Sequence, residues 1–82
     1  MPVVFRDGAF RAFFYSNEGS PREPMHVHVR RGGAEAKLWL EAGQVTVAES
    51  HGFDARTLGD IVRMVAARRA VIEEAWHDHF AD

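Results

Sequence analysis

The chain has no cysteine among its 82 residues. Disulfide bonds, thiolate zinc ligands and a cysteine nucleophile are therefore excluded together, and the composition fits a reducing cytoplasm. The chain also lacks an apolar run near the roughly 18 residues that a membrane-spanning helix needs. The N-terminus has no basic segment followed by an apolar core, as a signal peptide would. We expect a soluble, cytoplasmic protein with no membrane partner.

The chain also lacks a strong excess of positive or negative charge. The net charge is −2 with histidine neutral, so only a local basic patch would serve nucleic-acid binding. Hydrophobic residues make up 46% and charged residues 27%, which is typical of a globular protein rather than a disordered one. The length allows one modest core, which predicts a single domain over residues 1–82.

Turn signals predict two hairpins. Asp7-Gly8 predicts a two-residue turn within residues 3–15, which would pair Phe5 with Phe10 and place Val4 opposite Arg11. Gly32-Gly33 predicts a second turn, and there the apolar and polar residues separate cleanly onto two faces. The predicted pairs are Arg30 with Glu35, His28 with Lys37 and His26 with Trp39 on the polar face, and Val29 with Ala36, Val27 with Leu38 and Met25 with Leu40 on the apolar face.

A further strand and a helix complete the predicted fold. Residues 44–49 would add Val45 and Val47 to the apolar face and place Thr46 beside Trp39. From Asp54, a reasonable N-cap, apolar residues recur at three- and four-residue steps. We therefore expect an α+β fold: an antiparallel sheet of four or five strands built from hairpins, with one long C-terminal helix of about 25 residues packed on one face.

The chemically distinctive stretch is a proline-containing loop, residues 16–24, that leads into a strand with strict alternation. His26, His28 and Arg30 share one face of that strand. The predicted hairpin adds Lys37 and Trp39 to the same face. Because one helix covers only one face of a sheet, we expect these five residues to form an open binding surface.

The histidine pair allows several interpretations. The least specific is two exposed histidines on a solvated face. As an enzyme, His26 and His28 would be the catalytic acid and base of a ribonuclease, with Arg30 or Lys37 binding phosphate. As a metal site, the same two histidines need a third ligand, and nothing in the pattern directs His51 toward them. No cofactor is expected.

Pro24-Met-His-Val-His-Val resembles the motif of a family of small bacterial proteins, a domain-of-unknown-function family marked by Pro-Pro-His-x-His. Pro24, His26 and His28 match that motif, and Met25 stands where the family usually has its second proline. The resemblance implies a small cytoplasmic α+β protein. It also implies a gene that often lies beside that of another small protein, in an arrangement similar to a toxin–antitoxin pair.

These observations predict a small intracellular interaction module from a toxin–antitoxin-like pair. It would bind a protein partner or nucleic acid, RNA among them, through His26, His28, Arg30, Lys37 and Trp39. A histidine-dependent ribonuclease and a metal-binding protein are the alternatives. Exposed edge strands, which a hairpin sheet leaves unpaired, are compatible with a homodimer.

Overall fold

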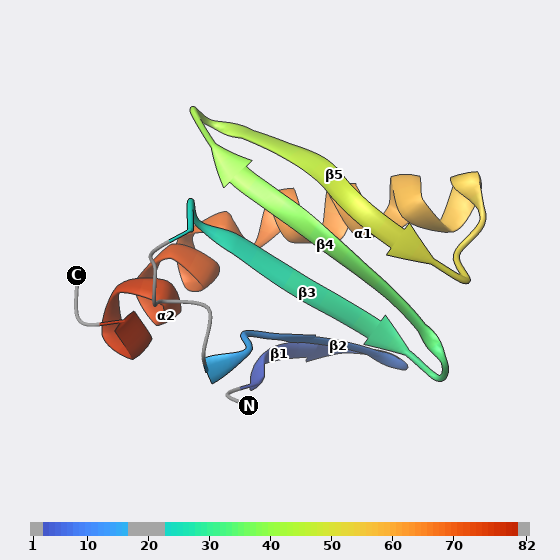
Figure 1. Ribbon diagram of the computed structural model, residues 1–82, viewed down its shortest axis with the longest axis horizontal. Coiled ribbons are helices and arrows are strands. Elements are labelled where there is room, and N and C mark those ends of the chain that lie inside the picture. The colour runs from blue at the N-terminus through green and yellow to red at the C-terminus, as the bar shows by residue number, and fades with distance from the viewer. Residues whose placement is uncertain (1–2, 17–22, 81–82) are drawn as a thin grey trace.

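The sheet is a five-stranded antiparallel meander in which each strand pairs with the next along the chain, and two helices lie behind it (Figure 1). The computed structural model describes residues 3–16 and 23–80. It confirms the α+β fold and the sheet built from hairpins. The elements are β1 (Val3–Asp7), β2 (Phe10–Phe13), β3 (His26–Arg31), β4 (Ala34–Glu41), β5 (Gln44–His51), α1 (Ala55–Ala67) and α2 (Arg69–Phe80). Within the described residues, no helix has the length and apolar character to cross a membrane.

The hairpin of β3 and β4 has the predicted register. Arg31 and Ala34 pair around the Gly32-Gly33 turn, and five of the predicted pairs follow from there. The sixth predicted neighbour, Met25, accepts a backbone hydrogen bond from Leu40 at 2.9 Å. In β5, Thr46 lies opposite Trp39 as predicted. The strict alternation of apolar and polar residues explains this agreement, because a one-residue slip would bury the charged face.

The hairpin of β1 and β2 differs from the prediction in its register. Asp7 pairs with Phe10, so the turn residues are Gly8 and Ala9 rather than Asp7 and Gly8. Gly8 has a φ of 59°, which suits glycine at the first central position of a tight turn. The shift places Arg6, not Val4, opposite Arg11. An irregularity between Val3 and Phe5 also places Val3 opposite Phe13 rather than Ala12, and Val4 packs against the core.

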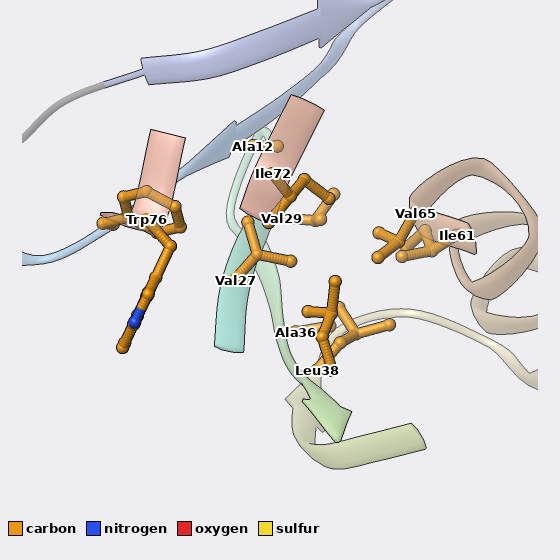
Figure 2. Close-up of a cluster of buried hydrophobic side chains, with 11 residues drawn as sticks. Ala12, Val27, Val29, Ala36, Leu38, Ile61, Val65, Ile72 and Trp76 are labelled. Carbon is orange, nitrogen blue, oxygen red and sulfur yellow. The ribbon is translucent and has the colours of Figure 1, made fainter. Parts of the chain in front are cut away.

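The core lies between the inner face of the sheet and the two helices (Figure 2). Val27, Val29 and Leu38 are fully buried on the sheet side. Ile61 and Ile72 are fully buried on the helix side. Such side chains contribute roughly 1.5–3 kcal/mol each when removed from water, which makes this layer the main source of stability.

The prediction of one long helix is wrong, because the helical segment breaks at Arg68. That residue has φ −111° and ψ 21°, outside the helical range. A straight helix over residues 55–80 would be about 39 Å long, whereas the longest extent of the domain is 34 Å. The break turns α2 toward β1, where Arg68 binds Asp7 at 3.0 Å and lies over the ring of Phe5.

Gly52 connects β5 to α1 in a conformation that other residues rarely adopt. Its φ is 87°, and an added Cβ would lie 2.8 Å from the Cβ of Ala34. We expect Gly52→Ala to lower the free energy of unfolding by about 1–3 kcal/mol, measured by urea denaturation. Gly33→Ala is the control, because a Cβ there meets nothing within 4 Å and φ is not positive. Equal losses in the two variants would contradict this account.

Asp54 caps α1, as predicted, by accepting a hydrogen bond from the backbone N–H of Thr57 at 2.8 Å. This bond lowers the pKa of Asp54 below its ordinary value of 3.8. A lowered pKa stabilises the fold above the unfolded-state value, and that contribution is lost as pH falls through the folded-state pKa. Asp54→Ala should therefore reduce thermal stability at neutral pH but not in strong acid. Asp54→Asn, which retains a cap, should lose less; a pH-independent difference for Asp54→Ala would count against this assignment.

Candidate functional site

The outer face of the sheet is the face turned away from α1 and α2. Directly opposed residues in neighbouring strands share a face, so the pairing places the outer side chains in rows across the sheet. The first row is Arg6, Arg11, Arg30, Glu35 and His51. The second row is Phe13, His28, Lys37 and Glu49, and the third is His26, Trp39 and Thr46. All five predicted binding residues therefore lie on one face, in adjacent rows.

The expectation that both histidines are open to a ligand is wrong. The exposed fraction is 0% for His26 and 6% for His28. Trp39, Lys37 and Arg30 are partly exposed, as a binding surface requires. Most of the predicted loop, residues 17–22, lies outside the described residues, so its part in the surface stays a prediction.

His26 is buried between two tryptophans. Its ring centroid lies 5.4 Å from that of Trp39 on β4 and 5.2 Å from that of Trp76 on α2. Trp76 therefore lies beside the start of β3. Nδ1 of His26 lies 2.8 Å from the carbonyl oxygen of Pro24. Since a carbonyl only accepts, Nδ1 carries the proton and donates this bond.

His28 is buried in an aromatic cluster. Its ring stacks on Phe13 with 5.6 Å between centroids, and the ring of Tyr15 meets it edge-on at 4.5 Å. Tyr15 follows β2 and keeps the alternation of that strand, so its side chain lies over the outer face. The sequence did not show this cover, because it depends on how β2 pairs with β3.

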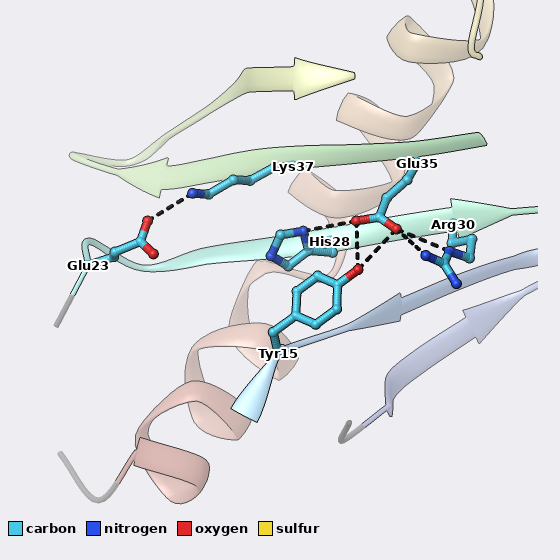
Figure 3. A network of polar contacts seen from close by, with 6 residues as sticks. All are labelled: Tyr15, Glu23, His28, Arg30, Glu35 and Lys37. Atoms are coloured by element: carbon cyan, nitrogen blue, oxygen red, sulfur yellow. Dashed lines mark hydrogen bonds and ion pairs between the residues drawn. The ribbon is translucent and has the colours of Figure 1, made fainter. Parts of the chain in front are cut away.

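Glu35 is the centre of a polar network on the outer face (Figure 3). Its carboxylate accepts hydrogen bonds from the Tyr15 hydroxyl at 3.0 and 3.2 Å, and from Arg30 Nη2 at 2.6 Å and Nε at 3.1 Å. His28 Nδ1 lies 3.5 Å from the same carboxylate. The hydrogen bonds and charge of Glu35 raise the pKa of Arg30 above its ordinary value. The guanidinium of Arg30 is therefore already engaged within the protein.

Lys37 is engaged in a similar way. Its Nζ donates to Glu23 at 2.8 Å and lies 4.4 Å from the ring centroid of Trp39. The ammonium therefore has an acidic partner and also covers part of the Trp39 ring. Of the five predicted residues, Trp39 keeps partly exposed aromatic surface, and Arg30 and Lys37 already have carboxylate partners.

Sequence reasoning missed two arginines of the outer face, Arg6 and Arg11. Arg11 lies directly opposite Arg6 on one side and Arg30 on the other, and we call these three residues the arginine row. The guanidinium carbon of Arg11 lies 5.5 Å from the centroid of the Phe13 ring. The signal in the sequence was the symmetric placement of Arg6 and Arg11 around Gly8-Ala9, which the predicted turn at Asp7-Gly8 concealed.

Charges of opposite sign occupy opposite halves of the outer face. The arginine row lies on β1, β2 and β3. Outward positions of β4 and β5 hold Glu35, Glu41 and Glu49, with Lys37 the one cation among the described residues of those positions. The face thus has a basic half and a predominantly acidic half.

The histidine pair does not belong to a metal-binding group within the described part of the chain. No set of three or more His, Cys, Asp or Glu side chains there is arranged to hold an ion. His51, considered as a third ligand, lies on β5 in the first row, whereas His26 lies in the third. Imidazole pairs alone do not complete the four-coordinate sites that zinc prefers.

Comparisons with known proteins identify the family. No curated protein and no solved structure matches the chain. The family model described as a domain of unknown function, DUF4160, matches residues 9–77. The match covers most of the chain, including β2 through β5, α1 and most of α2. The chain therefore belongs to the DUF4160 family.

Proposed function

We propose that this protein is a binding module that holds a protein partner on the outer face of its sheet. The observation that carries the proposal is the separation of charge on a face that lies away from both helices, except at the start of β3, where Trp76 of α2 packs on His26. Complementary surfaces guide association and fix the orientation of the bound partner. The partner is expected to present acidic groups toward β1, β2 and β3, and basic groups toward β4 and β5.

The mixed charge favours a protein over a nucleic acid. A nucleic acid carries one sign of charge along its whole backbone, and proteins that bind it neutralise several phosphates. The arginine row would attract such a strand, but Glu35, Glu41 and Glu49 would repel it on the other half of the face. A protein surface carries both signs and is able to complement both halves.

The burial of His26 and His28 is the reason for not proposing the two alternatives. A general base needs to come within hydrogen-bond distance of the proton that it removes, and a metal ligand needs access to its ion. Side chains of Phe13, Tyr15, Trp39 and Trp76 surround the two imidazoles. Both rings are thus better suited to packing the end of the sheet than to contact with a substrate.

For the identity of the partner we extend the proposal to a toxin–antitoxin-like pair. The support is the family resemblance of the Pro24-Met-His-Val-His-Val motif, which implies a second small protein encoded beside this one. In this arrangement the outer face would bind the product of the neighbouring gene.

The test is calorimetric titration of this protein with the product of the neighbouring gene. We expect a saturable complex that the double variant Arg6→Glu/Arg11→Glu weakens at least about tenfold, because reversed charges oppose an acidic surface. Arg56→Glu/Arg63→Glu, on α1 behind the sheet, is the matched control and should leave the affinity unchanged. Equal effects of the two double variants, or no complex with the wild type, would overturn the proposal. If a short single-stranded RNA binds more tightly than the neighbouring gene product does, the partner is a nucleic acid and the proposal of a protein partner is overturned.

A further inference from the structure

The arginine row is an arrangement that costs stability in the isolated protein. Arg6, Arg11 and Arg30 occupy directly opposed positions on three neighbouring strands. Side chains at such positions have Cβ atoms about 4.5–5.5 Å apart, and like charges there repel one another. A carboxylate placed between them would turn this repulsion into attraction.

Arg30 shows what a carboxylate does in this row. Glu35 lies opposite Arg30 on the next strand and binds its guanidinium through Nε and Nη2. The two cross-strand neighbours of Arg11, in contrast, are both arginines. A carboxylate for Arg11 therefore has to come from outside the sheet.

Arg11 has its donors free within the described structure. It makes no hydrogen bond or ion pair with any described residue, and its Nε is buried without a hydrogen-bond partner. Because this Nε is covered by the protein itself, an acceptor from outside would meet the partly exposed side chain through its other guanidinium N–H groups. Arg6, its neighbour on the edge strand, is exposed.

The side chain of Arg11 is also held in place before any ligand binds. Its guanidinium lies near the ring of Phe13, which is fully buried and which also has Arg30 at 5.9 Å. A planar guanidinium held near an aromatic ring loses little further conformational freedom on binding. The geometry of its N–H groups suits bidentate hydrogen bonding to the two oxygens of a carboxylate.

We infer that Arg11, with Arg6 beside it, forms an anion site that receives a carboxylate group from an acidic segment of the protein partner. The inference rests on the proposed function for the source of the carboxylate. Arg11 would form a bidentate pair of hydrogen bonds with the carboxylate at the centre of the site, and Arg6 would supply positive charge at its exposed edge. Arg30 remains bound to Glu35, and its part is to occupy the position opposite Arg11 so that no carboxylate of the sheet lies there.

The test uses the ¹⁵N-labelled protein and follows the arginine Nε–Hε resonances by NMR during titration with a short polyglutamate peptide. We expect saturable, salt-dependent shifts at Arg11 and Arg6 and none at Arg56, an exposed arginine of α1. Arg11→Gln should weaken binding at least about tenfold. Arg11→Lys keeps the positive charge but cannot form the bidentate hydrogen bonds, so its affinity should lie between those of Arg11→Gln and the wild type. Amide spectra of both variants check that the sheet is intact.

Several outcomes would overturn the inference. They are shifts of equal size at Arg56, no shift at Arg11, and an Arg11→Lys variant that binds as tightly as the wild type. A short single-stranded RNA that shifts the Arg11 resonance at lower concentration than polyglutamate would also overturn the inference, because the anion would then be a phosphate rather than a carboxylate of a protein.

If the complex with the neighbouring gene product forms and Arg11→Gln leaves it unchanged, the anion site fails while the proposed function stands. If polyglutamate binds at Arg11 but that complex does not form, the proposed function fails instead.

Discussion

Replacement of Trp76 by alanine is expected to lower the free energy of unfolding by about 3–5 kcal/mol. The Trp76 side chain is 2% exposed and lies between the sheet and the end of α2. Its ring contacts Phe14 and Phe80, with centroid distances of 5.3 and 4.3 Å, in addition to His26. Because small domains have a total stability of about 5–15 kcal/mol, the variant should be partly unfolded at physiological temperature.

Urea denaturation followed by circular dichroism measures this loss, and Trp39 remains as a fluorescent reporter in the variant. Val71→Ala is the matched control, since Val71 lies on the same helix and is 52% exposed. The control should change stability by no more than about 0.5 kcal/mol. Trp76→Phe should retain the fold at an intermediate stability. A loss below about 1 kcal/mol in Trp76→Ala would show that α2 does not anchor the sheet.

The second large effect is expected at Glu35. Glu35→Ala should lower the free energy of unfolding by about 1–3 kcal/mol, because it removes the acceptor for the Tyr15 hydroxyl and for Arg30. It should also leave three uncompensated arginines in the row. We therefore expect the loss to grow as ionic strength decreases, since salt screens the repulsion among them.

A double-mutant cycle with Tyr15→Phe separates the hydrogen bond from the remaining effects. The two single losses should sum to more than the loss in the double variant, because both remove the same bond. Glu49→Ala is the control, an exposed carboxylate on the outer face of β5. Additive losses in the cycle, or a loss in the control as large as that of Glu35→Ala, would show that the network contributes little.

The second hairpin and the start of the helix were predictable from the sequence because local chemistry determines them. Gly32-Gly33 sets the turn, and alternation from Met25 to Leu40 sets the register. Asp54 is recognised as a cap because its side chain bonds three residues ahead, within the same segment. The five predicted binding residues share a face for the same reason, since strand alternation alone places them there.

The remaining features depend on contacts between segments distant in sequence. The break at Arg68 has no proline or glycine to mark it, and it coincides with contacts of Arg68 to Asp7 and Phe5, more than sixty residues earlier in the chain. The burial of His26 requires Trp76, which lies fifty residues further along the chain. The arginine row requires the pairing of β2 with β3, across a loop whose length says nothing about register.

The meander has a consequence for how the chain folds. Each strand pairs with the next one in sequence, so three of the four pairings close through tight turns and only β2 with β3 requires a longer loop. Proteins rich in local contacts fold quickly, because little loop entropy is lost before contacts form. The contact that Arg68, at the break before α2, makes with Asp7 and Phe5 of β1 joins the two ends of the described chain. We therefore expect β3, β4 and β5 to form early and the docking of α2 against β1 to be the late, rate-determining step of folding.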